Sequence, residues 1–140
     1  MNRILILACI LISQSALAQD ITGKWTTIDD NTGKKRSVVE IYKKGDKYFG
    51  KVSDMYLEPH EPKDPICDLC TDERKDQRTL GMEIIRNMVK DGVEYSGGDI
   101  LDPENGKVYR CKLWVEDGKL MVRGYVAFFF RTQEWVKMRE

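Results

Sequence analysis

The sequence has 140 residues, of which 41% are hydrophobic, and its 23 basic residues balance its 23 acidic residues. This composition gives no indication of nucleic acid or of an anionic membrane surface as a partner. It is that of a folded protein with one hydrophobic core that does not depend on crosslinks.

The first 18 residues have the pattern of a signal peptide. Arg3 is followed by an apolar run over residues 4–12, and Ala16 and Ala18 supply the small residues that precede a cleavage site. The run is too short to span a bilayer. We therefore expect cleavage after Ala18 and a periplasmic or secreted protein. Lipidation at Cys9 is an alternative, although few residues precede that cysteine.

Three strands are predicted in the first part of the remaining chain, over residues 23–28, 36–43 and 48–56. Their Trp, Thr, Val, Ile and Tyr residues favour strands, and residues 29–33 and 44–47 have turn composition. Short turns between successive strands are typical of an up-and-down meander.

Residues 57–79, called the cysteine loop below, interrupt this pattern. The segment contains three prolines, many charges, Cys67 and Cys70, and has no apolar period. A loop of this length in a compact domain is either functional or poorly ordered, so we expect it to form the mouth of the folded domain.

Two more strands are predicted after the loop. Residues 81–88 are ambiguous between helix and strand, and a strand ending at Asp91-Gly92 fits the surrounding pattern better. Residues 94–101 also have strand character, and Gly97-Gly98 within them indicates a bulge or a barrel corner.

The strongest local signal is a hairpin around Asp117-Gly118, between the runs KVYRCKLWVE and KLMVRGYVAFFF. A two-residue turn of this type fixes the register, which pairs Glu116 with Lys119 and Cys111 with Gly124. A last strand is expected over residues 131–138. The predicted fold is thus all-β: a single small antiparallel up-and-down barrel of about eight strands, formed by residues 19–140.

The sequence also resembles the family known as domain of unknown function 2147, small secreted bacterial proteins. The matching positions, in order, are Gly23-x-Trp25, Leu80-Gly81, Gly97-Gly98, Asp102-Pro103-x-x-Gly106-Lys107-x-Tyr109, Leu120-x-Val122-Arg123-Gly124-Tyr125 and Arg131-Thr132-Gln133-x-Trp135. The resemblance implies a lipocalin-like barrel of the calycin type with no established activity and no catalytic residues to transfer. Many members end the last motif with Trp-x-Arg, where this chain has Lys137.

The cysteines allow three interpretations. The first is a local disulfide between Cys67 and Cys70 that leaves Cys111 as a buried thiol, which suits an oxidising compartment. A zinc site would combine these three cysteines with His60, but the hairpin register directs Cys111 into the barrel. A redox site would require a helix N-terminus, and the acidic surroundings of the pair oppose it. We prefer the disulfide and predict no metal and no cofactor.

The expected site is the barrel interior, where a small hydrophobic molecule would bind. The inward residues predicted to line it are Trp25, Tyr109, Cys111, Leu113, Val122, Gly124 and Val126. Trp25 is also expected to plug one end of the barrel, with Arg131 stacked on its ring. The alternative is a filled barrel that contacts an envelope protein through its outer surface around Trp114, Met121 and Phe129. No catalytic constellation is recognisable, so we do not predict an enzyme.

Overall fold

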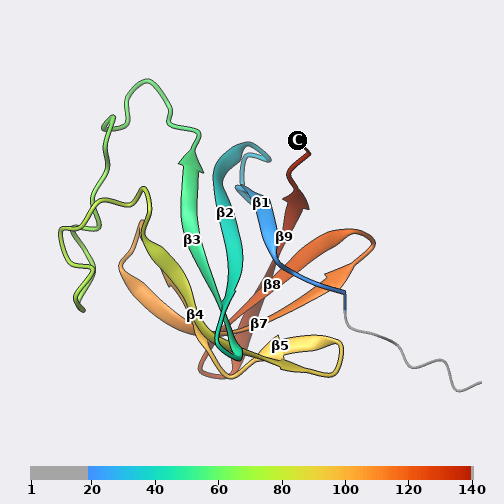
Figure 1. Ribbon diagram of the computed structural model, residues 1–140. Coiled ribbons are helices and arrows are strands. Elements are labelled where there is room, and N and C mark those ends of the chain that lie inside the picture. Colours follow the sequence, from blue (N-terminus) through green and yellow to red (C-terminus); the bar gives the residue numbers. More distant parts are fainter. Residues whose placement is uncertain (1–18, 140) are drawn as a thin grey trace, which may run out of the picture.

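The computed structural model describes residues 19–139, in which nine β-strands form one antiparallel sheet (Figure 1). The strands are β1 (Gly23–Ile28), β2 (Lys35–Lys44), β3 (Lys47–Met55), β4 (Glu83–Asp91), β5 (Glu94–Ser96), β6 (Asp99–Asp102), β7 (Lys107–Glu116), β8 (Lys119–Val126) and β9 (Phe129–Lys137). No helix long and apolar enough to cross a membrane occurs between residues 19 and 139.

The sheet closes on itself into a barrel. Its strand order is β3-β2-β1-β9-β8-β7-β5-β4-β6, and β3 also pairs with β4 while β7 also pairs with β6. The short strands β5 and β6 both lie between β4 and β7, so they act as two halves of one bent strand. The predicted antiparallel barrel of about eight strands is confirmed.

The bend between β5 and β6 lies at Gly97-Gly98, as the paired glycines indicated. A Cβ atom on Gly98 would lie 2.0 Å from the carbonyl oxygen of Arg86, so only glycine permits this approach of the two backbones. On the facing strand, Asn87 has a φ of 60°. The segment that was ambiguous between helix and strand is therefore β4, a strand that is itself irregular where it meets the bend.

The β7–β8 hairpin has the predicted register, including the pairs Glu116–Lys119 and Cys111–Gly124. Asp117 and Gly118 have φ angles of 51° and 75°, as a primed turn requires. The predicted boundary of the last strand was wrong. A second tight turn at Ala127 ends β8 at Val126, and β9 already begins at Phe129. Ala127 has a φ of 52° without being a glycine or an asparagine, so composition gave no turn signal there.

One end of the barrel is closed by side chains and by the segment that precedes β1. The indole Nε1 of Trp25 donates to the carbonyl oxygen of Ile21 at 2.8 Å. The Tyr95 hydroxyl donates to the carbonyl oxygen of Gln19 at 3.2 Å. The rings of Tyr48 and Tyr95 meet edge to face, with centroids 4.8 Å apart. This half of the barrel is a packed core, which leaves the opposite end for a site.

The cysteine loop lies on the outside of the barrel, between β3 and β4 (Figure 1). The side chain of Arg74 is only 6% exposed; it forms an ion pair with Asp72 at 2.6 Å and donates to the carbonyl oxygen of Glu83 at 2.9 Å. A Cβ atom on Gly106 would lie 2.0 Å from the carbonyl oxygen of Leu69, so the loop also packs closely against the β6–β7 turn. These contacts hold the loop in place.

Candidate functional site

A cavity of about 470 Å³ occupies the end of the barrel opposite Trp25. It lies where β1, β3, β6 and β8 end and where β2, β4, β7 and β9 begin. All strands except β5 therefore contribute to its wall. Its apolar lining consists of Ile28, Val52, Met55, Ile84, Ile100, Leu101, Tyr109, Val122, Val126 and Trp135. A cavity of this size and lining is typical of a site for one small molecule.

Charged residues gather at the rim of the cavity. They are the carboxylates of Asp29, Asp30, Asp102 and Glu104 and the guanidinium groups of Arg36 and Arg131. Arg36 bonds to Glu61 at 2.9 Å and to Glu104 at 2.6 Å, and the hydrogen bond with Glu104 is the main cause that raises the pKa of Arg36. Nε of Arg131 donates to Asp30 at 2.8 Å. The rim carries more acidic than basic groups, and the basic groups are already paired.

A few uncharged polar groups also line the cavity. The hydroxyl groups of Thr27 and Ser37 lie 2.8 Å apart. The Trp135 indole donates to Oε1 of Gln133 at 3.2 Å, and the amide nitrogen of Gln133 lies 3.4 Å from Asp30. These groups offer a ligand a small number of fixed polar contacts on a mainly apolar wall.

The structure divides the seven predicted interior residues into two groups. Tyr109, Val122, Gly124 and Val126 line the cavity. Trp25, Cys111 and Leu113 belong instead to the packed core. The inward face of a strand runs the whole length of the barrel, and alternation along the sequence does not reveal which half is filled.

Several cavity residues were missed because they lie on strands that were not used for register. Thr27 and Ser37 face each other across β1 and β2, and Ile84 begins the interior side of β4. Gln133 and Trp135 alternate on β9. Pairing β9 with β8 from the turn at residues 127–128 would have placed Trp135 opposite the inward Leu120.

The predicted stacking of Arg131 on Trp25 was wrong. Trp25 pairs with Lys137 in the β1–β9 ladder, and Nζ of Lys137 lies 4.6 Å from the centre of the Trp25 ring system. Arg131 is at the other end of β9, where it bonds to Asp30. A cation does cover the indole, as expected, but it is Lys137 and not Arg131.

Cys67 and Cys70 lie at disulfide distance, with sulfur atoms 1.98 Å apart and Cα atoms 5.4 Å apart, and both are buried. Cys111 is separate from them: its Sγ lies 3.4 Å from Sδ of Met88, and burial, with a smaller effect of Asp99, raises its pKa to about 12. His60 is exposed on the cysteine loop. The residues of the hypothetical zinc set are therefore not brought together, and no cluster of three metal-ligating side chains is found in residues 19–139.

The cysteine loop was predicted to form the mouth of the barrel. In the structure it contributes only one residue to the cavity lining. Thr79 is the loop's contribution to the cavity lining, whereas the turns after β1 and β6 supply most of the rim. The loop borders a second depression, the outer groove, of about 540 Å³, on the outer surface. The groove adjoins the cavity at Asn105, Tyr109 and Val126, which line both.

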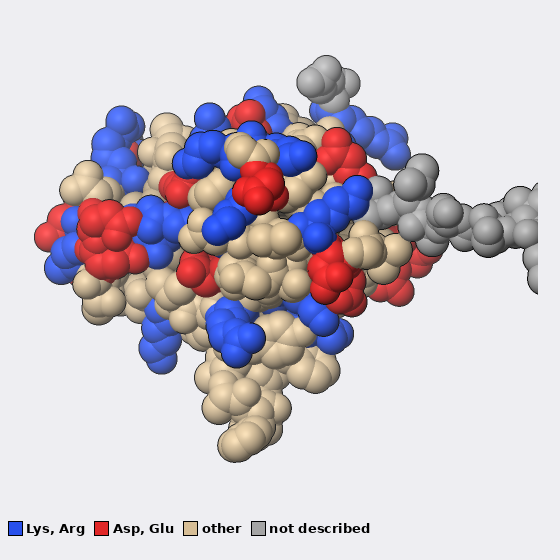
Figure 2. Space-filling model, turned by 60° about the horizontal axis from the view of Figure 1, so that its bottom comes forward, with Lys and Arg blue, Asp and Glu red and all other residues tan. Residues whose placement is uncertain are grey.

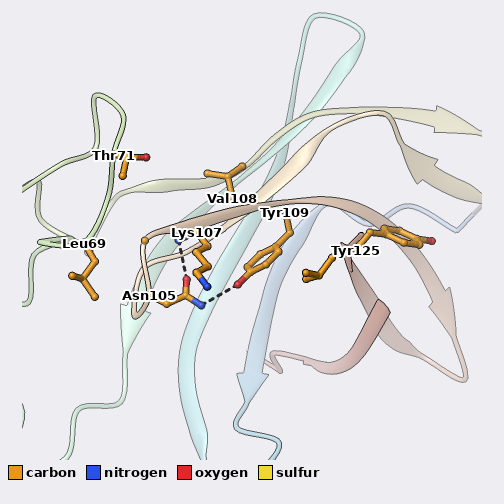
Figure 3. Close-up of a pocket in the computed structure, with 9 residues that line it drawn as sticks. Leu69, Thr71, Asn105, Lys107, Val108, Tyr109 and Tyr125 are labelled. Atoms are coloured by element: carbon orange, nitrogen blue, oxygen red, sulfur yellow. Dashed lines mark hydrogen bonds between the residues drawn. The ribbon is translucent and has the colours of Figure 1, made fainter. Parts of the chain in front are cut away.

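The outer groove lies between the cysteine loop and the wall of the barrel (Figure 3). Leu69 and Thr71 face it from the loop, and Val108 and Tyr125 from β7 and β8. Nδ2 of Asn105 donates to the Tyr109 hydroxyl at 3.0 Å. The groove is lined largely by exposed side chains and lacks the enclosing wall of the interior cavity, which makes the cavity the better candidate site.

A closed antiparallel barrel of this kind, with a cavity at one end, is a lipocalin-like fold. The fold is similar to that of protein HP1028 from the human pathogen Helicobacter pylori, described as belonging to the lipocalin family, with a TM-score of 0.72 and 16% sequence identity over 86% of this chain and 84% of that one. Residues 23–137 match the model of the family DUF2147, described as uncharacterized protein conserved in bacteria, and the chain belongs to that family. No curated protein matches the sequence.

Proposed function

We propose that this protein binds one small hydrophobic or amphipathic molecule in the cavity at the open end of the barrel. The observation that carries the proposal is the cavity of about 470 Å³ with apolar walls and a charged rim. Burial of an apolar group there would be favourable by roughly 25 cal/mol per Å² removed from water. Similarity to a lipocalin-family protein supports the proposal, because eight-stranded barrels of that kind hold one small ligand.

The rim favours certain ligands over others. Four carboxylates and two arginines line it, and both arginines already bond to carboxylates. An anionic head group would meet this acidic excess and would have to displace an existing ion pair. The preferred ligand therefore has an apolar body and a neutral or cationic polar end.

The protein is proposed to act in the periplasm or outside the cell. The signal peptide predicted for residues 1–18 lies outside the described residues. The Cys67–Cys70 pair supports export, since disulfides persist in oxidising compartments. Residues 19–140 would then form the working protein as a single domain.

The proposal is tested by filling the cavity. Gly124 lines it, and a Cβ atom there would meet only Cβ of Tyr109 at 3.7 Å, an ordinary contact, so Gly124→Leu should place a side chain in the open space without forcing the backbone. Titration with a neutral apolar fluorophore such as N-phenyl-1-naphthylamine should show saturable binding by the wild type. We expect Gly124→Leu to weaken it at least about tenfold, because the added side chain takes the space of several ligand atoms.

The matched control is Val136→Leu, which adds bulk on the exposed side of β9 at a residue that is 44% accessible. It should bind the fluorophore as the wild type does. Equal binding by the wild type and Gly124→Leu, with both folded, would place the fluorophore elsewhere and reject the proposal.

The alternative hypothesis of a filled barrel has less support, because only the half around Trp25 is filled. A zinc or thiol-redox role through Cys67 and Cys70 is also disfavoured, since these two sulfur atoms are at bonding distance and buried. An outer contact surface does have a specific observation in its favour, the exposure of aromatic residues at the β8–β9 turn.

A further inference from the structure

The turn between β8 and β9 carries the most exposed large apolar side chains of the described chain. Phe128 is 99% accessible, Phe129 77% and Phe130 59%, and Val126 before the turn is 55% accessible. We call residues 126–130 the aromatic tip. Figure 2 shows one face of the molecule, on which acidic and basic side chains are interspersed. At the lower edge of this view, a projection carries neither kind of side chain. Three consecutive exposed phenylalanines are costly in water and indicate a contact surface.

Cations lie beside the aromatic tip on the outer wall of the barrel. The register places Arg110, Tyr125 and Phe130 in one row across β7, β8 and β9, and Lys112 and Arg123 in the next. The guanidinium of Arg123 lies 4.2 Å from the centre of the Phe130 ring. Within residues 19–139, neither Arg110 nor Arg123 forms an ion pair, whereas Lys112 pairs with Glu94 at 3.1 Å. Arg110 and Arg123 thus offer positive charge that is not engaged in an ion pair within these residues.

We propose that the aromatic tip inserts into an anionic phospholipid surface while Arg110 and Arg123 contact its head groups. A two-residue turn projects its side chains outward, so the aromatic tip is a convex feature of five residues, whereas each partner of a stable protein complex contributes roughly 20 to 30 residues to the interface. It can, however, enter the boundary between head groups and acyl chains, where aromatic rings are favoured and neighbouring cations attract anionic lipids. The combination of apolar tip and unpaired cations fits this surface better than a protein groove.

The orientation follows from where the charges lie. The cations are on the outer wall, whereas the rim of the cavity is acidic, so the barrel would rest tilted with β7–β9 toward the membrane. Val126 belongs both to the aromatic tip and to the cavity lining, so one edge of the mouth would reach the lipid surface. Membrane contact does not require the cavity to bind anything, and the two proposals can fail separately.

Flotation with vesicles tests the proposal. The wild type should bind vesicles of phosphatidylglycerol and phosphatidylethanolamine at low salt and bind phosphatidylcholine vesicles weakly. Phe128→Ser with Phe129→Ser should reduce binding to the anionic vesicles at least about tenfold, because the inserted apolar area is lost. The control Val93→Ser removes an apolar side chain that is 53% accessible at the β4–β5 turn and should leave binding unchanged.

The cations are tested in the same way. Arg110→Gln with Arg123→Gln should weaken binding to anionic vesicles severalfold and abolish the preference over phosphatidylcholine, whereas Lys47→Gln at the β2–β3 turn should not. Wild type and variants share one N terminus, so residues 1–18 cannot cause a difference between them.

A reporter at the tip gives a second measurement. Phe128→Trp should show a blue-shifted emission with anionic vesicles, and brominated acyl chains should quench it. The proposal is overturned if the wild type does not bind these vesicles at low salt, or if the serine variant binds equally well. It is also overturned if the tip instead mediates self-association that the serine variant loses while vesicle binding is absent.

Discussion

At the scale of single residues, Gly98 is a position where the barrel wall has no room for a side chain. Its missing Cβ would collide with the backbone carbonyl of Arg86 at 2.0 Å and would come within 2.6 Å of Sδ of Met88. We expect Gly98→Ala to lower the free energy of unfolding by about 2 kcal/mol or more, because a backbone contact must open. Urea denaturation measures this directly.

Gly124→Ala is the matched control, since its Cβ would stand 3.7 Å from Cβ of Tyr109 in ordinary contact. Its free energy of unfolding should stay within roughly 0.5 kcal/mol of the wild type. If both alanine variants proved equally stable, the close packing of β4 against the β5–β6 bend would be refuted.

At the scale of elements, the cysteine loop is held to the barrel partly by the pair Asp72–Arg74. Hydrogen bonding to Arg74 is the main cause that lowers the pKa of Asp72 from 3.8 to about 2. A carboxylate whose pKa is depressed in the folded state stabilises the fold above its unfolded pKa. That stabilisation is lost progressively as the pH falls from about 4 to about 2.

The pH dependence of unfolding therefore distinguishes Asp72→Asn from the wild type. The variant should be less stable at pH 6, and the difference should shrink as the pH falls through this window. Measuring urea unfolding of both proteins between pH 2 and pH 6 isolates Asp72 from the other carboxylates. A difference that does not change with pH would show that the ion pair is not what holds the loop.

Also at this scale, the β7–β8 hairpin was predictable and the β8–β9 turn was not. Asp117 and Gly118 are residues that tolerate positive φ, so the turn and the whole register followed from them. The second turn has Ala127 at positive φ inside an apolar run, where sequence pattern predicts a continuing strand. The exposure of residues 128–130 is a consequence of that unpredicted turn.

At the scale of the whole molecule, alternation of inward residues predicted a barrel but not which half of it is open. The closed half depends on residues distant in sequence, such as Trp25, Tyr48 and Tyr95, and on the segment around Ile21. Composition likewise did not predict that Arg110, Lys112 and Arg123 lie together on the outer wall, because equal numbers of acidic and basic residues do not indicate where each residue lies.

The central claim, that the cavity is the binding site, is tested most directly by backbone and indole NMR spectra during titration with a neutral monoacylglycerol. We predict saturable shifts of the Gly124 and Gln133 amides and of the Trp135 indole, with little change at Trp25 or Leu113 in the packed core. Shifts confined to Leu69, Thr71 and Lys107 would place the ligand in the outer groove, and would contradict the account, as would the absence of any shift.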